Sequence, residues 1–394
     1  MLIKTKVIGL GQAGNKVAIM AAEKNVVKID DIMLINTTDR DIPSEYKSDA
    51  FIFGDEMNGC GKERDLAKEK FEEVINNDIK FKEDLSSFLD VSTDDYMVIV
   101  VSSTEGGTGS GASPLLAKYL AENEIPTHII GLTGFEDDPK GMENTLNWMQ
   151  DLDTSLVVHM IDNRKFMDLA KSKEKAELLA NEEICNIINI ISGSTITESD
   201  TKNIDSTDLY KIVNQPGYMI VEESSLDGIE SKDDFNSKMK EMVKSSKAIK
   251  TVPKCWNMGV IINAKPKTVE CIDESFKIVS DAYGAAYEKF FHYQDVGGEQ
   301  YIQFIFDKMD RPKEEIQSLV ERYNRAADKV KYEDDDNFED AFTGFKARSG
   351  GKNTFHKSSK KVNLLRSLKR EKPIESKRLN TLGNTEDNTS KSEL

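Results

Sequence analysis

Short apolar runs alternate with amphipathic segments along the first half of the chain. Runs rich in Val, Ile, Leu and Phe predict strands at residues 4–10, 31–36, 51–53, 96–101, 128–132 and 155–160. Between them, helix-like segments are predicted at residues 16–24, 66–75 and 114–121. Parallel strands need crossover connections of this kind. The alternation therefore predicts an α/β fold with a parallel, Rossmann-like sheet covered by helices.

The second half opens with a long helix predicted at residues 175–191, where Leu and Ile recur near helical spacing. Strands predicted at 218–221, 258–263 and 301–306 indicate a smaller α/β unit, and a charged amphipathic helix is predicted at 312–331. From residue 345 onward Ser, Lys, Asn and Gly dominate, which is typical of a disordered tail. The expected segments are an N-terminal domain (1–174), a central helix (175–196), a polar loop with a C-terminal domain (197–311), a helical segment (312–344) and a basic tail (345–394).

Charge is distributed unevenly along the chain. The 394 residues include 53 Lys and Arg against 70 Asp and Glu, which gives a net charge of −17. Residues 346–394 carry +8, so the preceding body carries −25. A body of that charge repels nucleic acid and anionic membranes, whereas the tail attracts them. The longest apolar run, Met97–Val101, is too short to cross a membrane, so no membrane partner is expected.

The four cysteines form neither a CxxC pair nor a zinc-binding spacing. We therefore expect buried small apolar side chains in a reducing cytoplasm. Cys60, which lies between two glycines, is the exception. No residue is predicted to be a protein ligand of a metal ion.

The first chemical motif is a glycine loop placed between a predicted strand and a predicted helix. Gly9–Gly14 (GLGQAG) satisfies the GxGxxG pattern of dinucleotide-binding proteins, in which backbone N–H groups face an anion. Asp39, just after the second strand, would then suit the ribose-binding acid of an NAD-dependent enzyme. By itself this pattern does not decide between classes of nucleotide.

A second glycine loop follows the strand at 96–101. Residues 103–111 (STEGGTGSG) contain four glycines in six positions, which lets the backbone wrap closely around phosphate, while Thr108 and Ser110 add hydroxyl donors. A dinucleotide enzyme does not need a second phosphate cradle of this kind. The chain lacks GxxxxGK[ST], so a P-loop NTPase is not expected.

Together the two loops resemble those of the tubulin/FtsZ superfamily of GTPases. Residues 11–15 (GQAGN) are identical to tubulin's first nucleotide loop, and residues 105–111 (EGGTGSG) match the GGGTGSG signature, with Glu105 in place of its first glycine. The resemblance covers about residues 1–330. It implies binding of GTP or GDP through Gly11, Gln12, Ala13, Gly14 and Asn15 of the first loop and Gly106, Gly107, Thr108, Gly109, Ser110 and Gly111 of the second.

Further segments correspond to the other nucleotide loops of the family. The resemblance implies that residues 36–39, ending at Asp39, help to place Mg²⁺ through water, and that Gly59, Gly61 and Lys62 sense the γ-phosphate. It implies ribose contact by Glu136 and guanine contact by Asn163 and by Asn181 or Glu182. Guanine offers N1–H and N2–H₂ donors on one edge, which an amide or carboxylate oxygen accepts. The family's base-stacking aromatic is absent from the central helix, where Glu177 and Leu178 stand instead.

The polar loop after the central helix contains Asn203, Asp205 and Asp208, which match the family's catalytic pattern NxDxxD. Two carboxylates and an amide suit the positioning of a hydrolytic water. In the family this loop completes the GTP site of the next subunit. The resemblance thus implies head-to-tail polymers that hydrolyse GTP in trans.

Within the superfamily, the basic tail and the charged C-terminal helix are most similar to the TubZ group. That similarity implies a cytomotive filament that segregates plasmid or phage DNA through a TubR-like DNA-binding adaptor, with direct DNA contact by the tail also open. The tail residues expected to bind the partner are Lys360, Lys361, Arg366, Lys369 and Arg370. The alternatives are a phage spindle tubulin that positions viral DNA and, from another class, a non-polymerising nucleotide-binding module or NAD-dependent enzyme.

Overall fold

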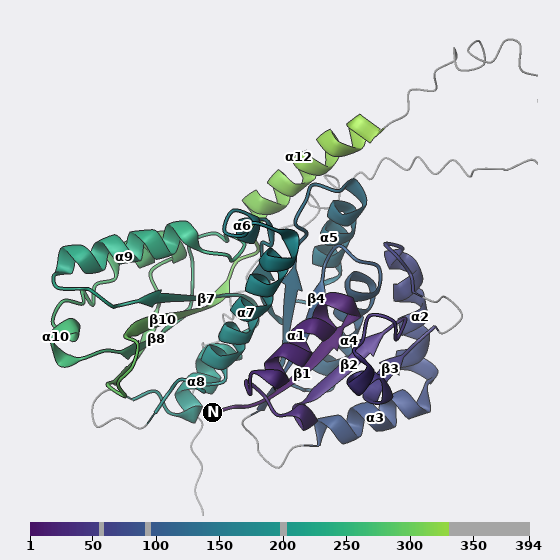
Figure 1. Ribbon diagram of the computed structural model, residues 1–394, viewed down its shortest axis with the longest axis horizontal. Helices are drawn as coiled ribbons and strands as arrows, with labels where there is room; N and C mark the ends of the chain where they lie inside the picture. Colours follow the sequence, from purple (N-terminus) through teal and green to yellow (C-terminus); the bar gives the residue numbers. More distant parts are fainter. Residues whose placement is uncertain (55–58, 91–95, 198–202, 331–394) are drawn as a thin grey trace, which may run out of the picture. The chain divides into compact units, whose positions relative to one another are not determined.

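The computed structural model describes residues 1–54, 59–90, 96–197 and 203–330 (Figure 1). One sheet of ten strands runs through this part, in the order β3-β2-β1-β4-β5-β6-β7-β10-β8-β9. The strands are β1 (Lys4–Leu10), β2 (Ile32–Asn36), β3 (Ala50–Ile52), β4 (Tyr96–Ser103), β5 (Thr127–Leu132), β6 (Val157–Ile161), β7 (Gly217–Ser225), β8 (Asn257–Asn263), β9 (Glu288–Gln294) and β10 (Tyr301–Met309).

The strands from β3 to β7 pair in parallel, as the alternating sequence pattern predicts. β10 is antiparallel to both of its neighbours, β7 and β8, and β8 pairs in parallel with β9. β1 lies between β2 and β4, with Leu10 opposite Ile35 and Ser102. The α/β class with a parallel N-terminal sheet is confirmed.

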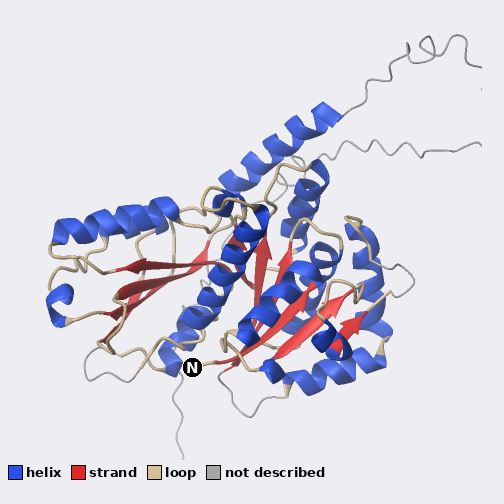
Figure 2. Cartoon of the chain, in the orientation of Figure 1, coloured by secondary structure: helices blue, strands red, loops and turns tan. Residues whose placement is uncertain are grey.

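Helices cover both faces of the sheet (Figure 2). On one face α1, α7 and α8 pack on apolar side chains of the strands, and on the other face α2–α5, α9 and α11 do so. The helices are α1 (Gly11–Glu23), α2 (Arg64–Asn77), α3 (Ile79–Leu89), α4 (Thr108–Glu122), α5 (Pro139–Asp151), α6 (Arg164–Met167), α7 (Lys173–Ile191), α8 (Ser206–Val213), α9 (Lys232–Ser245), α10 (Pro266–Val269), α11 (Lys277–Tyr283) and α12 (Lys313–Val330).

The ends of several elements differ from the sequence-based prediction. Residues 11–15 form the first turn of α1 rather than a loop, and Pro114 lies in the second turn of α4 rather than opening it. Residues 108–114 of α4 are all buried, so their packing outweighs the backbone hydrogen bond that proline removes. Helices α3, α5, α6 and α8–α11 and strand β9 were not predicted.

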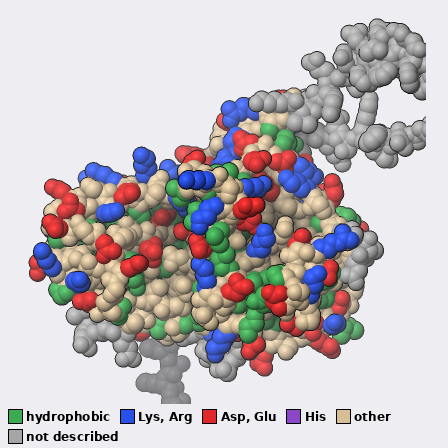
Figure 3. Space-filling model, in the orientation of Figure 1, with side chains coloured by type: hydrophobic (Ala, Val, Ile, Leu, Met, Phe, Trp, Pro, Cys, Tyr) green, Lys and Arg blue, Asp and Glu red, His purple; other side chains and the backbone are tan. Residues whose placement is uncertain are grey.

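The described residues contain no helix that is long and apolar enough to span a membrane. Cys185 and Cys255 are buried, as predicted, whereas Cys271 is partly exposed. Cys60, the expected exception, is buried as well. On the face in Figure 3, acidic and basic side chains are interspersed, so the acidic excess is not gathered into one patch there. The described residues belong to one compact unit, Met1–Lys331, and the tail from residue 345 lies outside them. The predicted domain boundaries remain a prediction.

Candidate nucleotide-binding site

Both glycine loops open at the same edge of the sheet, because β1 and β4 are parallel neighbours. Gly11 has a φ of +74°, and a Cβ there would lie 3.1 Å from the backbone N of Gly109, so the two loops touch. A Cβ on Gly14 would collide with the carbonyl of Val101, which explains a glycine at that position. The close approach leaves a cavity of about 330 Å³ between the loops.

Two helix N-termini face this cavity. α1 begins at Gly11 and α4 at Thr108, and both residues line it. Neither helix has a side-chain cap, so backbone N–H groups of their first turns remain available. Two helix N-termini with free N–H groups favour an anion, and this chemistry fits phosphate.

Small polar groups form the wall of the same cavity. The Oγ1 atoms of Thr37 and Thr108 lie 2.8 Å apart, and Cys60 Sγ lies 3.0 Å from Thr108 Oγ1. Behind them, Asn15 Oδ1 and Asn36 Nδ2 are buried and have no partner among the described residues. The wall thus contains hydroxyl and amide groups that can hydrogen-bond to a polar ligand.

The third predicted loop closes the phosphate side. Gly59 and Gly61 line the cavity, both with positive φ, and the Gly61 carbonyl accepts a hydrogen bond of 2.9 Å from the N–H of Gly107. Lys62 lies elsewhere: it lines the adjoining cavity and pairs with Asp138 at 2.5 Å. Burial is the largest single influence on the pKa of the Asp138 carboxyl and raises it. The hydrogen bonds from Lys62 and Gly141 and the charge of Lys62 together outweigh burial, so the net pKa is lowered.

Asn144 of α5 joins the loops, and sequence reasoning missed it. Its side-chain amide donates to the carbonyls of Lys62 at 3.0 Å and Glu105 at 2.9 Å, with a longer contact to Gly106 at 3.4 Å. The residue is 1% exposed. One buried amide therefore holds the third loop against the second. Asn144 is 82 residues from Lys62 and 39 residues from Glu105 along the chain.

A second cavity of about 160 Å³ continues from the first, with which it shares Ala13 and Ser103. Glu136, Asn163 and Asn181 line it together. The phosphate end and the three residues predicted for ribose and base are thus brought into one groove. Its predicted lining residues are Gly11, Gln12, Ala13, Gly59, Gly61, Gly106, Gly107, Thr108 and Gly109 in the first cavity, and Ala13, Lys62, Glu136, Asn163 and Asn181 in the second.

The second cavity contains features that suit a base. Asn163 is 6% exposed and its Oδ1 is buried without a partner in the described structure, so it is an acceptor available to guanine. Phe135 also lines the cavity, and Lys173 Nζ lies 5.7 Å from its ring centroid. Phe135 supplies an aromatic from the loop after β5, where the central helix has none.

Several predicted contact residues lie outside the groove lining. Glu182 pairs with Lys24 at 2.9 Å, so Asn181 is the member of that pair that faces the cavity. Asp39 pairs with Lys47 at 3.2 Å, whereas Asp41 lines the phosphate end. The remaining residues of this kind lie in the N-terminal parts of α1 and α4. They are Gly14, Asn15, Ser110 and Gly111.

The described residues contain no cluster of three His, Cys, Asp or Glu side chains that would hold a metal ion. Mg²⁺ at nucleotide sites is held largely by phosphate oxygens and water, with one or two carboxylates. The groove fits that pattern, because Asp41 is the carboxylate at its phosphate end. Asp41 would hold such an ion, which would neutralise phosphate charge.

The predicted catalytic loop lies away from this groove. Asp205 caps α8 by accepting a hydrogen bond of 2.8 Å from the N–H of Asp208, and Asn203 and Asp205 are exposed. The loop follows the C-terminal end of α7, whereas Asn181 and Lys173 of the groove belong to its N-terminal half (Figure 1). Within one chain, Asp205 and Asp208 do not meet the groove.

Comparison with known proteins places the groove in a family. Residues 4–171 match the model for the tubulin/FtsZ family GTPase domain. This segment is a tubulin/FtsZ-family GTPase domain. It contains both glycine loops, the third loop and the second cavity's Glu136 and Asn163.

Similarity extends beyond that domain. The tubulin-like protein CetZ2 of Haloferax volcanii is 23% identical over 350 residues, which cover 84% of this chain and 95% of that protein. The cell division protein FtsZ of Aquifex aeolicus is 22% identical over 226 residues, covering 55% and 58%. A GTPγS-form protofilament of TubZ from Bacillus thuringiensis serovar israelensis has a TM-score of 0.68 at 17% identity, covering 83% of this chain and 92% of that one. The fold is therefore tubulin-like, and the family's members are GTPases with filament-forming relatives.

Proposed function

We propose that this chain binds GTP with Mg²⁺ and polymerises head-to-tail, so that each subunit completes the hydrolytic site of its neighbour. The observation that carries the proposal is the separation within one chain: the groove opens at one end of α7, and Asp205 and Asp208 lie beyond the other. A site whose parts lie on opposite ends is completed by stacking. Stacking of this heterologous kind extends into a filament.

Relatives support this assembly. CetZ2 of Haloferax volcanii has been solved as a GTPγS-bound protofilament, and TubZ of Bacillus thuringiensis as GTPγS-form and GDP-form protofilaments. We infer that the present chain forms protofilaments through the same ends. GTP would bind at the groove of one subunit, below the exposed loop of the next.

The experiment is GTP turnover per subunit as a function of protein concentration, with filaments followed by light scattering. Turnover should rise across the concentration at which scattering begins, because the loop arrives from a neighbour. Turnover that stays constant through the onset of scattering would contradict a shared site. Absence of guanine-nucleotide binding would contradict the GTPase itself, and release of NAD would favour the dehydrogenase alternative.

We further propose that the filament moves DNA through a DNA-binding adaptor captured by the basic tail. The tail residues concerned, Lys360, Lys361, Arg366, Lys369 and Arg370, lie outside the described residues. The proposal rests on their charge and on structural likeness to TubZ. The 84% coverage by CetZ2 favours a second candidate, a cytoskeletal filament without DNA cargo, and binding of the chain to adaptor-coated DNA decides between them.

A further inference from the structure

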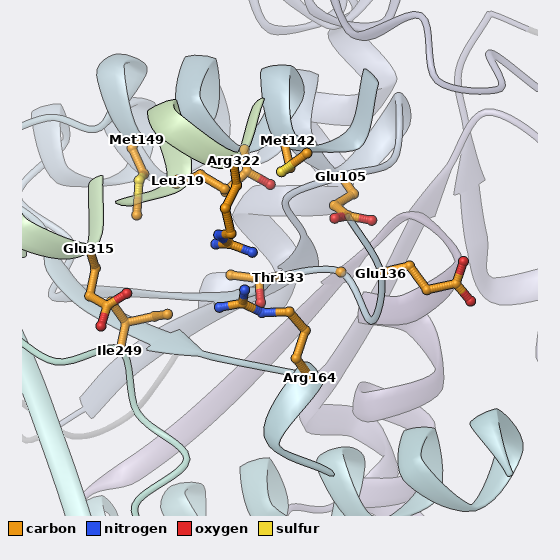
Figure 4. Close-up of a pocket in the computed structure, with 12 residues that line it drawn as sticks. Glu105, Thr133, Glu136, Met142, Met149, Arg164, Ile249, Glu315, Leu319 and Arg322 are labelled. Atoms are coloured by element: carbon orange, nitrogen blue, oxygen red, sulfur yellow. The ribbon is translucent and has the colours of Figure 1, made fainter. Parts of the chain in front are cut away.

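Glu105 occupies the position where the family signature has its first glycine, and it lies where the groove meets a neighbouring small cavity. It lines both the second cavity of the groove and that small cavity, which is closed by Leu319 and Arg322 of α12. Figure 4 shows Glu105 above the loop that carries Thr133 and Glu136, with the Glu136 side chain pointing away from the small cavity. A carboxyl group has thus been introduced beside the nucleotide groove.

The Glu105 carboxylate is seated in a niche made by two glycines. A Cβ on Gly134 would coincide with the carboxylate, and a Cβ on Gly141 would lie 2.8 Å from it. The Gly134 backbone N–H hydrogen-bonds to it. The Glu105 main chain is also held, because its carbonyl accepts from Asn144. The carboxylate therefore occupies one defined place, between the loop after β4 and the loop after β5.

Burial is the main influence on the charge of this group. It raises the pKa of Glu105 to about 7, with Asp138 acting in the same direction and Lys62 and Lys173 opposing it. The remaining charged groups that line the cavities around Glu105 are Glu136, Arg164, Glu177, Glu315 and Arg322. Near neutral pH, Glu105 therefore exists in both protonation states.

We propose that the carboxyl group of Glu105 takes up a proton from solvent when a guanine nucleotide enters the groove. This inference rests on the proposed function, since it needs a nucleotide in the groove. The phosphates bring negative charge to the loop that carries Glu105, because the next residues, Gly106 and Gly107, line the phosphate end of the groove. A nearby like charge favours the neutral form of an acid. By linkage, nucleotide affinity falls as pH rises through about 7, where the empty protein loses the proton that binding requires.

Calorimetry on the full chain with GDP tests this, in two buffers of different ionisation enthalpy and from about pH 6 to about pH 8.5. The wild type should take up about half a proton at neutral pH, and its Kd should rise about 30-fold over that range. Glu105→Gln should bind across the range as the wild type does at low pH. Titration of the nucleotide's own phosphate is common to both proteins, so the difference between them isolates Glu105.

Glu143→Gln is the matched control, because Glu143 is a carboxylate of the neighbouring helix α5 that pairs with Lys140 at 3.3 Å and does not line the groove. It should keep the wild-type proton uptake. If wild type and Glu105→Gln take up equal numbers of protons, the inference is wrong while nucleotide binding stands. If the wild type binds no GDP at any pH, the proposed function fails and this inference fails with it.

A second pair of variants tests the niche. Gly134→Ala should weaken GDP binding, because the added methyl group displaces the Glu105 carboxylate. Adding Glu105→Gly to Gly134→Ala should restore most of the affinity, because the methyl group then enters vacated space. Equal weakening in the single and double variants would contradict the placement of the carboxylate.

Discussion

The two ends of α7 differ in how firmly the structure holds them. At the groove end, close glycine contacts, a buried amide and paired helix N-termini fix three loops against each other. At the other end, Asn203 and Asp205 are exposed, and Asp205 accepts the hydrogen bond that caps α8. A site that must hold a nucleotide in the free subunit needs preorganised loops. A loop that acts on a neighbour needs exposure, so the difference between the ends is what the proposed division of roles requires.

Replacing the carboxylate of Asp205 should have the largest effect. Asp205→Asn keeps an oxygen that caps α8, whereas Asp205→Ala removes the cap, which is worth about 1 kcal/mol of stability. Both should lower GTP turnover about 100-fold or more, because the base that polarises water is lost. Both should bind nucleotide as the wild type does, measured by calorimetry on the monomer.

The paired variants separate catalysis from folding. If Asp205→Asn retains turnover and only Asp205→Ala loses it, the residue acts through the helix cap alone. Loss of GTP binding in either monomer would place the loop at its own groove and would erase the contrast between the two ends. Asp208→Ala should match Asp205→Asn in turnover.

Removing the amide of Asn144 should have the next largest effect, confined to the groove end. Asn144→Ala leaves the carbonyls of Lys62 and Glu105 without this donor. A buried group left without its hydrogen bond costs about 1–3 kcal/mol of stability. Nucleotide Kd should rise about 10- to 100-fold as the loops separate. The control is Gln150→Ala on the exposed face of the same helix, which should change Kd little. An unchanged Kd in Asn144→Ala would show that the loops are held by other contacts.

The sequence predicted the parts of the groove that are local motifs and missed the parts that depend on distant contacts. The glycine loops are local motifs, so residues 9–14 and 105–111 identified the groove before any contact was known. Asn144 acts through residues far away along the chain. It lies on α5, which was not predicted although Met142, Leu146 and Met149 recur there at helical spacing. β9 was missed because EKFFHYQ mixes polar and aromatic residues. Asp41 and Phe135 belong to no local motif, so only the three-dimensional structure shows that they line the two cavities.

Acid should destabilise both ends together, through a pair of histidines in the core. His128 and His159 lie on β5 and β6 with Nδ1 and Nε2 3.1 Å apart, and both are buried. Burial lowers the pKa of His128 to about 4 and lowers that of His159 as well. The unfolded chain then binds more protons than the folded one between about pH 6.5 and pH 4, so stability falls as pH falls through that window.

The expected loss is about 3 kcal/mol from His128 across the whole window. Chemical denaturation at about pH 7 and about pH 4 measures it, and His128→Gln should reduce the difference between the two. An equal pH dependence in wild type and His128→Gln would exclude this histidine as its source. Because the pair lies in the shared sheet, GDP binding and polymerisation should be lost at the same pH.

Removing the tail should have the smallest effect on either end. The predicted groove and loop residues end at Asp208, so a chain stopped after Phe345 should bind GTP, polymerise and turn over as the full chain does. It loses +8 of charge and leaves a body at −25, so binding to adaptor-coated DNA should fall sharply. Binding by the intact chain should weaken with salt, because exposed charges are screened beyond about 10 Å at 0.1 M.

A chain with residues 346–378 scrambled keeps the charge but moves Leu364, Leu365 and Leu368 off a common helical face. Recovery of the scrambled chain on adaptor-coated DNA would show that charge suffices, and equal recovery of intact, scrambled and truncated chains would exclude the tail from partner binding.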